Sequence, residues 1–192
     1  MHGPKVGVLA LQGAFAEHVA ALEALGAYAV EVRRPDALGG IDAIVIPGGE
    51  STTMSKLLDS SDLRGPVGDR LADGLPVFGT CAGLILLARE VADGRPDQRG
   101  FDALDVRVLR NGYGRQRDSF EVGIDLGGRE TDPFPAVFIR APRITRVGEA
   151  VEVLASVDGD PVLVRQGPVV AAAFHPELSG DLRLHQLFLG GI

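Results

Sequence analysis

Short β-rich apolar runs alternate with helical segments up to about residue 92, and this alternation limits the possible folds more than any other feature. Each run is bounded by Gly, Pro or Asp, which interrupt regular structure and favour turns. Strands that alternate with helices predict a parallel sheet covered by helices on both faces. The predicted strands are KVGVL (5–9), YAVEV (28–32), IDAIVI (41–46) and PVF (76–78), and the predicted helices are Ala14–Leu25, Thr52–Leu58 and Gly83–Val91.

From about residue 104 the sequence changes to strands separated by turns, which predicts an antiparallel hairpin region beside the parallel sheet. The segment DLRLHQLFL (181–189) predicts a terminal helix. No repeat or low-complexity linker divides the chain, so we expect residues 1–192 to form a single domain. The later strand candidates are LDVRVLRN (104–111), DSFEVGIDLGG (118–128), AVFIRAPRI (136–144), VEVLASVDG (151–159), PVLVRQG (161–167) and PVVAAAFHP (168–176).

Composition argues against several classes of function. The formal net charge of −7 disfavours a nucleic-acid partner, because such binding depends on clustered Lys and Arg. No apolar run approaches the roughly 20 residues that span a bilayer, so no membrane association is expected. A lone cysteine forms no intrachain disulfide and no signal-peptide core is present, which favours the cytoplasm. Neither metal-ligand spacing nor a P-loop or dinucleotide fingerprint occurs, so we expect no metal and no cofactor.

The single cysteine lies at a sharp corner, in the stretch Gly79-Thr-Cys-Ala-Gly83. This Gly-x-nucleophile-x-Gly form is typical of a nucleophile elbow, where a strand turns directly into a helix and only small neighbours fit. The helix amino end would lower the pKa of the Cys81 thiol from its free value of ~8.5. The N–H of Ala82 would then point toward a developing oxyanion. The alternative is a small buried hydrophobe, a common fate of a free cysteine.

A cysteine nucleophile needs a base and an orienting group, and four histidines are available. His2 is terminal, His18 is expected to face solvent or a contact surface, and His185 is expected to be structural. His175 differs, because it follows the apolar run VVAAAF and opens His175-Pro-Glu177. Proline favours an extended conformation at the residue before it, which would let Glu177 reach one ring nitrogen and leave the other for the cysteine. An exposed loop at the end of a strand is the alternative.

Two further features follow strand ends. The pair Gly48-Gly49 follows IVIP, and glycine there lets backbone N–H groups approach a ligand, so Gly49 is a candidate second oxyanion donor. A plain tight turn would explain the same pair. Arg110 and Arg140 each close a strand-like run, where a guanidinium can bind a substrate carboxylate through two parallel hydrogen bonds. Most arginines are simply solvated, so this signal is weak by itself.

Several segments together resemble the class I, or triad, glutamine amidotransferases that serve as glutaminase subunits of pyridoxal 5′-phosphate synthase. The resemblance runs from about Lys5 to Leu189, with the motifs in the family's order. It implies a flavodoxin-like sheet of the class I amidotransferase fold. The segments are ALQGAFAEH (10–18), IPGGESTT (46–53), GTCAGLILLA (79–88), RNGYGRQRDSFE (110–121), FIRAP (138–142), and FHPE (174–177) followed by DLRLH (181–185).

The resemblance also implies roles for individual residues. Cys81 would be the nucleophile, His175 the general base and acid, and Glu177 the orienting carboxylate, with L-glutamine as substrate. The implied partner is a separate (β/α)8-barrel synthase in a large complex, docked in part near Gln12 and His18. Departures from the family are minor: Gly112 replaces a more common alanine, and Arg117 stands at a variable position. The substrate site would comprise Gly49, Glu50, Ser51, Arg110, Ile139 and Arg140.

Three other functions remain open at this point. The chain could be a glutaminase that serves another synthase, although RNxYGRQxDSFE favours the vitamin pathway. It could be a cysteine-dependent stress protein or peptidase of the DJ-1/PfpI type, a group without GGESTT or His-Pro-Glu in this arrangement. A non-catalytic module that kept the fold is the third, and the intact Cys81, His175 and Glu177 argue against it.

Overall fold

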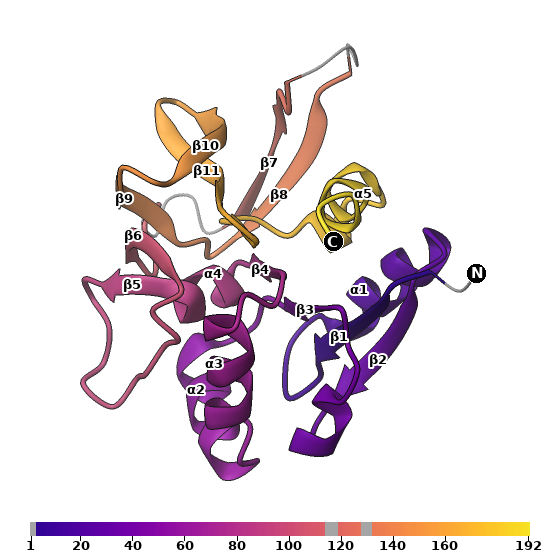
Figure 1. Ribbon diagram of the computed structural model, residues 1–192. Helices are drawn as coiled ribbons and strands as arrows, with labels where there is room; N and C mark the ends of the chain where they lie inside the picture. The colour runs from indigo at the N-terminus through magenta and orange to yellow at the C-terminus, as the bar shows by residue number, and fades with distance from the viewer. Residues whose placement is uncertain (1–2, 114–118, 128–131) are drawn as a thin grey trace.

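A seven-stranded sheet forms the centre of the protein in the computed structural model, which describes residues 3–113, 119–127 and 132–192 (Figure 1). Its strands lie in the order β10-β11-β12-β4-β3-β1-β2. Neighbours from β2 to β12 pair in parallel, whereas β10 and β11 are antiparallel additions at one edge. The parallel part has the strand order of flavodoxin-like doubly wound sheets. The bounds are β1 (Lys5–Leu9), β2 (Tyr28–Val32), β3 (Ala43–Ile46), β4 (Val77–Thr80), β10 (Glu152–Val157), β11 (Asp160–Gln166) and β12 (Val169–Ala172).

Helices cover both faces of this sheet, as the environment of β4 shows. Phe78 contacts Phe188, with ring centroids 5.6 Å apart, and the next residue, Gly79, lies against Leu87 on the opposite side. Because successive side chains of a strand point to opposite faces, the helices that carry these two partners lie on opposite sides of the sheet. The helices are α1 (Phe15–Ala24), α2 (Ser51–Ser60), α3 (Arg64–Ala72), α4 (Ala82–Leu87) and α5 (Arg183–Leu189), with short 3₁₀ turns η1 (Pro35–Leu38) and η3 (Pro176–Leu178).

Two smaller sheets complete the fold. One has the order β5-β6-β9, and the other is the antiparallel hairpin β7-β8, which extends outward from the body of the protein (Figure 1). The predicted combination of a mostly parallel sheet with an antiparallel hairpin region is therefore confirmed. No helix in the described ranges is long and apolar enough to cross a membrane. The bounds are β5 (Ala88–Val91), β6 (Leu104–Leu109), β7 (Ser119–Ile124), β8 (Phe134–Ile139) and β9 (Arg143–Val147).

The predicted helix over Gly83–Val91 is wrong in its second half. Helix α4 ends at Leu87, and Ala88–Val91 form β5, which pairs in parallel with β6. Pairing with β6 overrides the local helix propensity of these residues. One contact that favours the pairing joins Glu90 and Arg107, which lie opposite each other with Oε1 3.0 Å from Nε.

Two other elements differ from the prediction. Helix α3 was not among the predicted elements, and it contains Gly65, Pro66 and Gly68, which are poor helix formers. The proline lies in the first turn, where its missing N–H costs no helical hydrogen bond. The run AVFIRAPRI is divided into β8 and β9 at Arg140, whose φ of 44° ends the extended conformation.

The strands that lead to the candidate site are fully buried. Every residue of β3, β4 and β12 is buried, and these strands are built mainly from Val, Ile and Ala. Continuous apolar runs of this kind are typical of parallel strands covered on both faces. The rigid strands therefore present the loops that follow Ile46, Thr80 and Ala172 at one edge of the sheet.

Candidate active site

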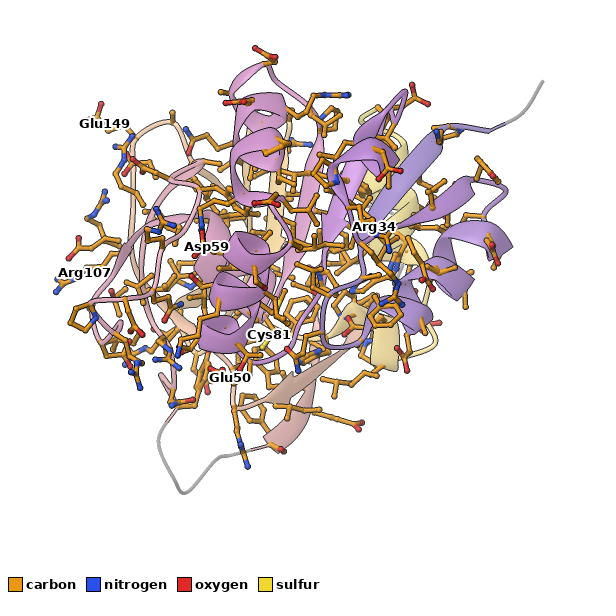
Figure 2. The ribbon with its side chains drawn as sticks, turned by 90° about the horizontal axis from the view of Figure 1, so that it is seen from below. Arg34, Glu50, Asp59, Cys81, Arg107 and Glu149 are labelled. Carbon is orange, nitrogen blue, oxygen red and sulfur yellow. The ribbon has the colours of Figure 1, made fainter. Side chains whose placement is uncertain are left out.

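A cavity of about 650 Å³ opens at the carboxyl ends of β3 and β4. This volume is within the range of ordinary small-molecule sites. Cys81 and Glu50 both line it, and Figure 2 shows them near the same end of α2. All the residues predicted for the substrate site contribute to the lining, which comprises Gly49, Glu50, Ser51, Cys81, Ile85, Arg110, Asn111, Ser119, Ile139, Arg140 and His175.

Cys81 occupies the predicted corner between β4 and α4. Its φ of 49° and ψ of −103° lie outside the regions that suit a side chain, so the backbone is strained there. Its N–H donates to the carbonyl of Ala172 at 2.8 Å, which holds the corner against β12. The thiol is 5% exposed and its Sγ lies 3.9 Å from the carbonyl oxygen of Ile139.

The two glycines of the elbow are required by close packing. A Cβ on Gly83 would collide with the carbonyl oxygen of Ile46, and one on Gly79 would lie 2.9 Å from the backbone of Gly83. The helix therefore lies directly on β3 and β4, with no space for side chains at these two positions. Ala82 is the first residue of α4 and is fully buried, so its N–H is one of the donors that a helix leaves without an intrahelical partner.

His175 and Glu177 form the second part of the site. Nδ1 of His175 lies 2.7 Å from Oε1 of Glu177, whose side chain is fully buried. His175 has φ −106° and ψ 87°, and its N–H donates to the carbonyl of Val137 at 2.8 Å. The expected contact is present, but its geometric reason was wrong: Pro176–Leu178 form a 3₁₀ turn, and this turn, not an extended segment, brings the carboxylate to the ring.

The surroundings of His175 favour its charged form. Burial by itself would lower the pKa of this imidazole, but hydrogen bonds to Cys81 and Glu177 outweigh it and raise the pKa to about 10. The hydrogen bond to the carboxylate uses Nδ1, which leaves Nε2 for the sulfur. Nδ1 of His175 thus contacts the carboxylate of Glu177, and the imidazole lines the same cavity as Cys81.

Gly48 is a site residue that the sequence reasoning missed, although its neighbour Gly49 was singled out. A Cβ on Gly48 would overlap the imidazole of His175 and come within 3.2 Å of Cβ of Cys81. Gly49 in turn faces Gln12, whose Oε1 accepts a hydrogen bond of 2.9 Å from the N–H of Glu50. The first glycine therefore lets the loop touch both catalytic candidates, a role that no sequence pattern separates from an ordinary turn.

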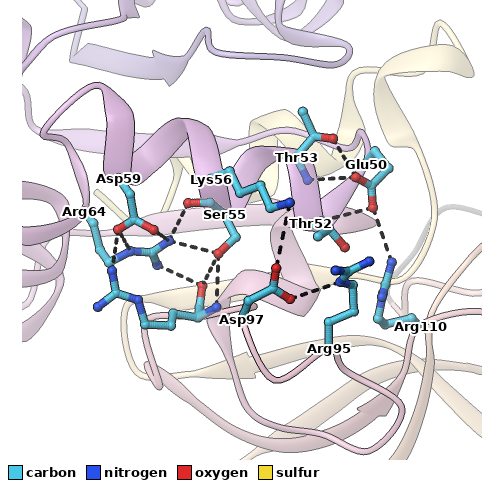
Figure 3. A network of polar contacts seen from close by, with 11 residues as sticks. Glu50, Thr52, Thr53, Ser55, Lys56, Asp59, Arg64, Arg95, Asp97 and Arg110 are labelled. Atoms are coloured by element: carbon cyan, nitrogen blue, oxygen red, sulfur yellow. Dashed lines mark hydrogen bonds and ion pairs between the residues drawn. The ribbon is translucent and has the colours of Figure 1, made fainter.

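Opposite charges meet at the polar side of the cavity. Oε1 of Glu50 lies 3.3 Å from Nη2 of Arg110, and the same carboxylate caps α2 by accepting from the N–H groups of Thr52 and Thr53 (Figure 3). Burial by itself would raise the pKa of Glu50, but the hydrogen bonds from Thr53 and Thr52 together outweigh it and lower the pKa to about 2. The side chain of Glu50 is therefore charged at neutral pH and half exposed, at 51%.

The two candidate arginines are positioned differently. Arg110 is anchored through its backbone, because its N–H donates to Oδ1 of Asp93 at 2.7 Å. Arg140 has a φ of 44°, which is rare outside glycine and is typical of functional turns. Gly112, the residue that departs from the family pattern, packs closely on Arg143, since a Cβ there would lie 2.7 Å from the backbone nitrogen of that arginine. Arg117 and part of its motif lie outside the described residues.

The expectation that His18 faces solvent or a contact surface is wrong. His18 is fully buried, with Nδ1 2.9 Å from Nε2 of His185 and Nε2 3.2 Å from Oγ1 of Thr80. Its side chain points from α1 toward β4, where it contacts the hydroxyl group of Thr80. Helix periodicity predicts which face of a helix is apolar but does not predict such a polar contact. His185 is also fully buried, as expected of a structural residue, and His2 lies outside the described residues.

Comparison with known proteins agrees with this geometry. Residues 8–192 match the SNO glutamine amidotransferase family. The chain belongs to this family. A protein of Mycobacteroides abscessus named pyridoxal 5′-phosphate synthase subunit PdxT is 59% identical over 186 residues, covering 97% of this chain and 96% of the relative. A protein of the same name from Frankia alni is 56% identical over 189 residues, covering 98% and 95%.

Solved structures give the same assignment. A crystal structure described as a glutamine amidotransferase superimposes with a TM-score of 0.90 at 50% identity, covering 97% of this chain and 99% of the other. PurLQS from Thermotoga maritima matches with a TM-score of 0.67 at 15% identity, covering 98% of each chain, which supports the fold alone. The resemblance that the sequence motifs suggested is thereby confirmed, as is the amidotransferase fold.

Proposed function

We propose that this protein is the glutaminase subunit of a pyridoxal 5′-phosphate synthase, which hydrolyses L-glutamine to L-glutamate and ammonia for vitamin B6 biosynthesis. Two relatives that are 56% and 59% identical to this chain are named as subunits of pyridoxal 5′-phosphate synthase. The matches cover 95% and 96% of their lengths. The observation that carries the proposal is that Cys81 and His175 line one cavity of about 650 Å³, with Nδ1 of His175 in contact with Glu177 at 2.7 Å. We also propose that residues 1–192 form one glutaminase domain.

The proposed reaction proceeds through a thioester. The thiolate of Cys81 attacks the side-chain amide carbon of glutamine, and His175 transfers a proton to the departing nitrogen, which leaves as ammonia. A water molecule, deprotonated by the same imidazole, then attacks the glutamyl thioester. The carbon–sulfur bond breaks, which releases glutamate and regenerates the thiolate of Cys81. Glu177 holds the imidazole in the tautomer that directs Nε2 to the sulfur, an arrangement that the 2.7 Å contact at Nδ1 supports.

The tetrahedral intermediates carry a negative oxygen, for which we propose two backbone donors. Ala82 begins α4 directly after the nucleophile, so its N–H lies at the positive end of the helix. Gly49 lines the same cavity as the nucleophile. Each donor would supply about 3 kcal/mol of transition-state stabilisation, by comparison with donor deletions in other hydrolases.

The remaining lining residues fit the two charges at the far end of glutamine. Glu50 can bind the α-ammonium group, and Arg110 can bind the α-carboxylate through a bidentate contact. In the structure the charged groups of Glu50 and Arg110 lie 3.3 Å apart. The α-amino and α-carboxylate groups of glutamine are also adjacent, so the spacing of the two side chains matches that of the substrate. Ser51, Ile139 and Arg140 complete the pocket around the side-chain amide.

The proposed partner is a separate (β/α)8-barrel synthase subunit in a large complex, which receives the ammonia through an internal channel. Shielding the ammonia is physically useful, because free ammonia is protonated in water and is then no longer a nucleophile. The relatives are named as subunits of this synthase, which favours it over other ammonia acceptors and over a stress protein or peptidase. A lone thiol without an intrachain disulfide fits a reducing compartment, so we place the complex in the cytoplasm.

A labelling experiment tests the proposal. A glutamine-analogue alkylator should inactivate the protein and label Cys81, as mapped by mass spectrometry, with protection by added glutamine. The variant Cys81→Ala should keep the melting temperature within a few degrees and lose glutamine hydrolysis, because only the nucleophile is removed. Hydrolysis retained in this variant, or labelling at another residue, would contradict the proposed mechanism.

A further inference from the structure

The polar contact between His175 and Glu177 continues behind the carboxylate into the protein interior. Oε1 of this carboxylate contacts His175, and its second oxygen, Oε2, lies 3.3 Å from Nε2 of His18. Nδ1 of His18 lies 2.9 Å from Nε2 of His185, and both rings are fully buried. Three separate elements, η3, α1 and α5, therefore contribute to one polar chain within the core.

The positions of the protons in this chain follow from the chemistry of its members. A carboxylate only accepts, and among the described residues Oε2 of Glu177 has no hydrogen bond of regular geometry, so the polar group that faces it is Nε2 of His18. Burial, together with the neighbouring His185 and His175, lowers the pKa of His18 well below its ordinary value. A neutral ring that donates at Nε2 must accept at Nδ1.

The last ring fits the same assignment. Burial lowers the pKa of His185 to about 4, so this ring is also neutral at physiological pH. Its Nε2–H then donates to His18, and its Nδ1 is an unprotonated acceptor with no partner in the described part of the chain. With this tautomer, the hydroxyl oxygen of Thr80, 3.2 Å from Nε2 of His18, accepts from the same N–H as the carboxylate. Thr80, Glu177, His175 and His185 are the polar or titratable groups that face His18.

We propose that His18 is a positioning residue for the glutaminase reaction: its Nε2–H holds the second oxygen of Glu177, and the Nε2–H of His185 fixes the tautomer of His18. This inference rests on the proposed function. A buried carboxylate held at one oxygen only can rotate about its terminal torsion, which is broad. A donor at the other oxygen fixes the carboxylate plane, and with it the ring of His175. Partners of this outer kind orient a reactive histidine without touching the substrate.

Two variants of similar length separate positioning from packing. His18→Gln keeps an N–H donor near the position of Nε2, whereas His18→Met fills comparable space without any donor. We expect His18→Met to lower kcat roughly 10- to 100-fold with little change in KM, and His18→Gln to recover most of the loss. The assay is glutamine hydrolysis by the full chain together with its synthase subunit, with melting temperatures measured for both variants.

The wild-type protein supplies a second measurement that does not depend on folding of a variant. Nitrogen-15 NMR of the imidazoles should show His18 and His185 neutral at pH 7, each protonated at Nε2 and not at Nδ1. A His18 ring protonated at Nδ1, or charged at pH 7, would overturn the proposal, as would equal kcat in His18→Met and wild type or equal losses in both variants. Absence of hydrolysis in the wild-type complex would instead contradict the proposed function.

Discussion

The substitution Gly48→Ala tests how closely the loop after β3 holds the catalytic imidazole. The new Cβ would lie 2.8 Å from Nδ1 of His175 and closer still to the adjacent ring carbon, whereas ordinary contact begins at 3.4 Å. The loop cannot easily retreat, because the carbonyl of Gly48 accepts a hydrogen bond from the N–H of Ala14 at 3.2 Å and also packs on Gly13. The ring must therefore move.

The size of the effect follows from this displacement. Restoring ordinary contact at Nδ1 by itself shifts the ring by about 0.6 Å, and the nearer ring carbon requires a larger shift; a displacement near 1 Å in an active site can cost about 100-fold in rate. The movement also disturbs the 2.7 Å contact with Glu177. We expect kcat/KM for glutamine to fall about 100-fold, which corresponds to about 3 kcal/mol of transition-state stabilisation.

The assay compares glutamine hydrolysis by Gly48→Ala and Gly65→Ala in the presence of the synthase subunit. Gly65 is an exposed residue of α3, and apart from its chain neighbours and the nearby backbone of its own helix no atom lies within 4 Å of the position that a Cβ would take there. Alanine at this position should therefore leave activity unchanged. If Gly48→Ala retains activity within twofold of the wild type, the loop does not position the imidazole as described.

Two further predictions concern stability and regulation. Because burial lowers the pKa of His185 to about 4, the folded state disfavours its protonation, so stability is complete above pH 6.5 and falls as the pH drops toward 4. Between pH 7 and pH 5 urea unfolding should show a loss about 2 kcal/mol larger in the wild type than in His185→Leu, which keeps the contribution of His18, and equal losses would contradict this. Glutamine hydrolysis should be slow in the isolated chain and rise when the synthase subunit is added. Equal rates with and without the partner would contradict gated activation.

The sequence predicted the parallel sheet well, because short β-rich runs bounded by turn residues carry a signal that depends little on context. The runs KVGVL and YAVEV became β1 and β2 with the expected bounds, and the helix at Ala14–Leu25 was correct to within one residue at each end. Prediction failed where pairing between distant segments competed with local preference. Ala88–Val91 became a strand because it pairs with β6. The residues around Ala88–Val91 do not by themselves indicate that pairing.

The candidate site was also predictable from the sequence only in part. Each of the motifs at Cys81, His175 and Glu50 follows a strand, and the carboxyl ends of parallel strands share one edge of a sheet, so their convergence was predictable. The close approach of Gly48 to the imidazole was not, because a glycine pair has the same appearance in any tight turn. The contact between His175 and Glu177 was foreseen, but the 3₁₀ turn that makes it was not.

By itself, then, the sequence determined the class of the sheet, the nucleophile corner and the family, since these depend on residue types within a few positions of each other. Only the tertiary structure decided the surroundings of His18, which lies 167 residues before His185 in the chain and 2.9 Å from it in space. The physical reason is that burial sets the charge of an imidazole and that its hydrogen-bond partners set its tautomer. Burial is a property of the elements that fold over the ring.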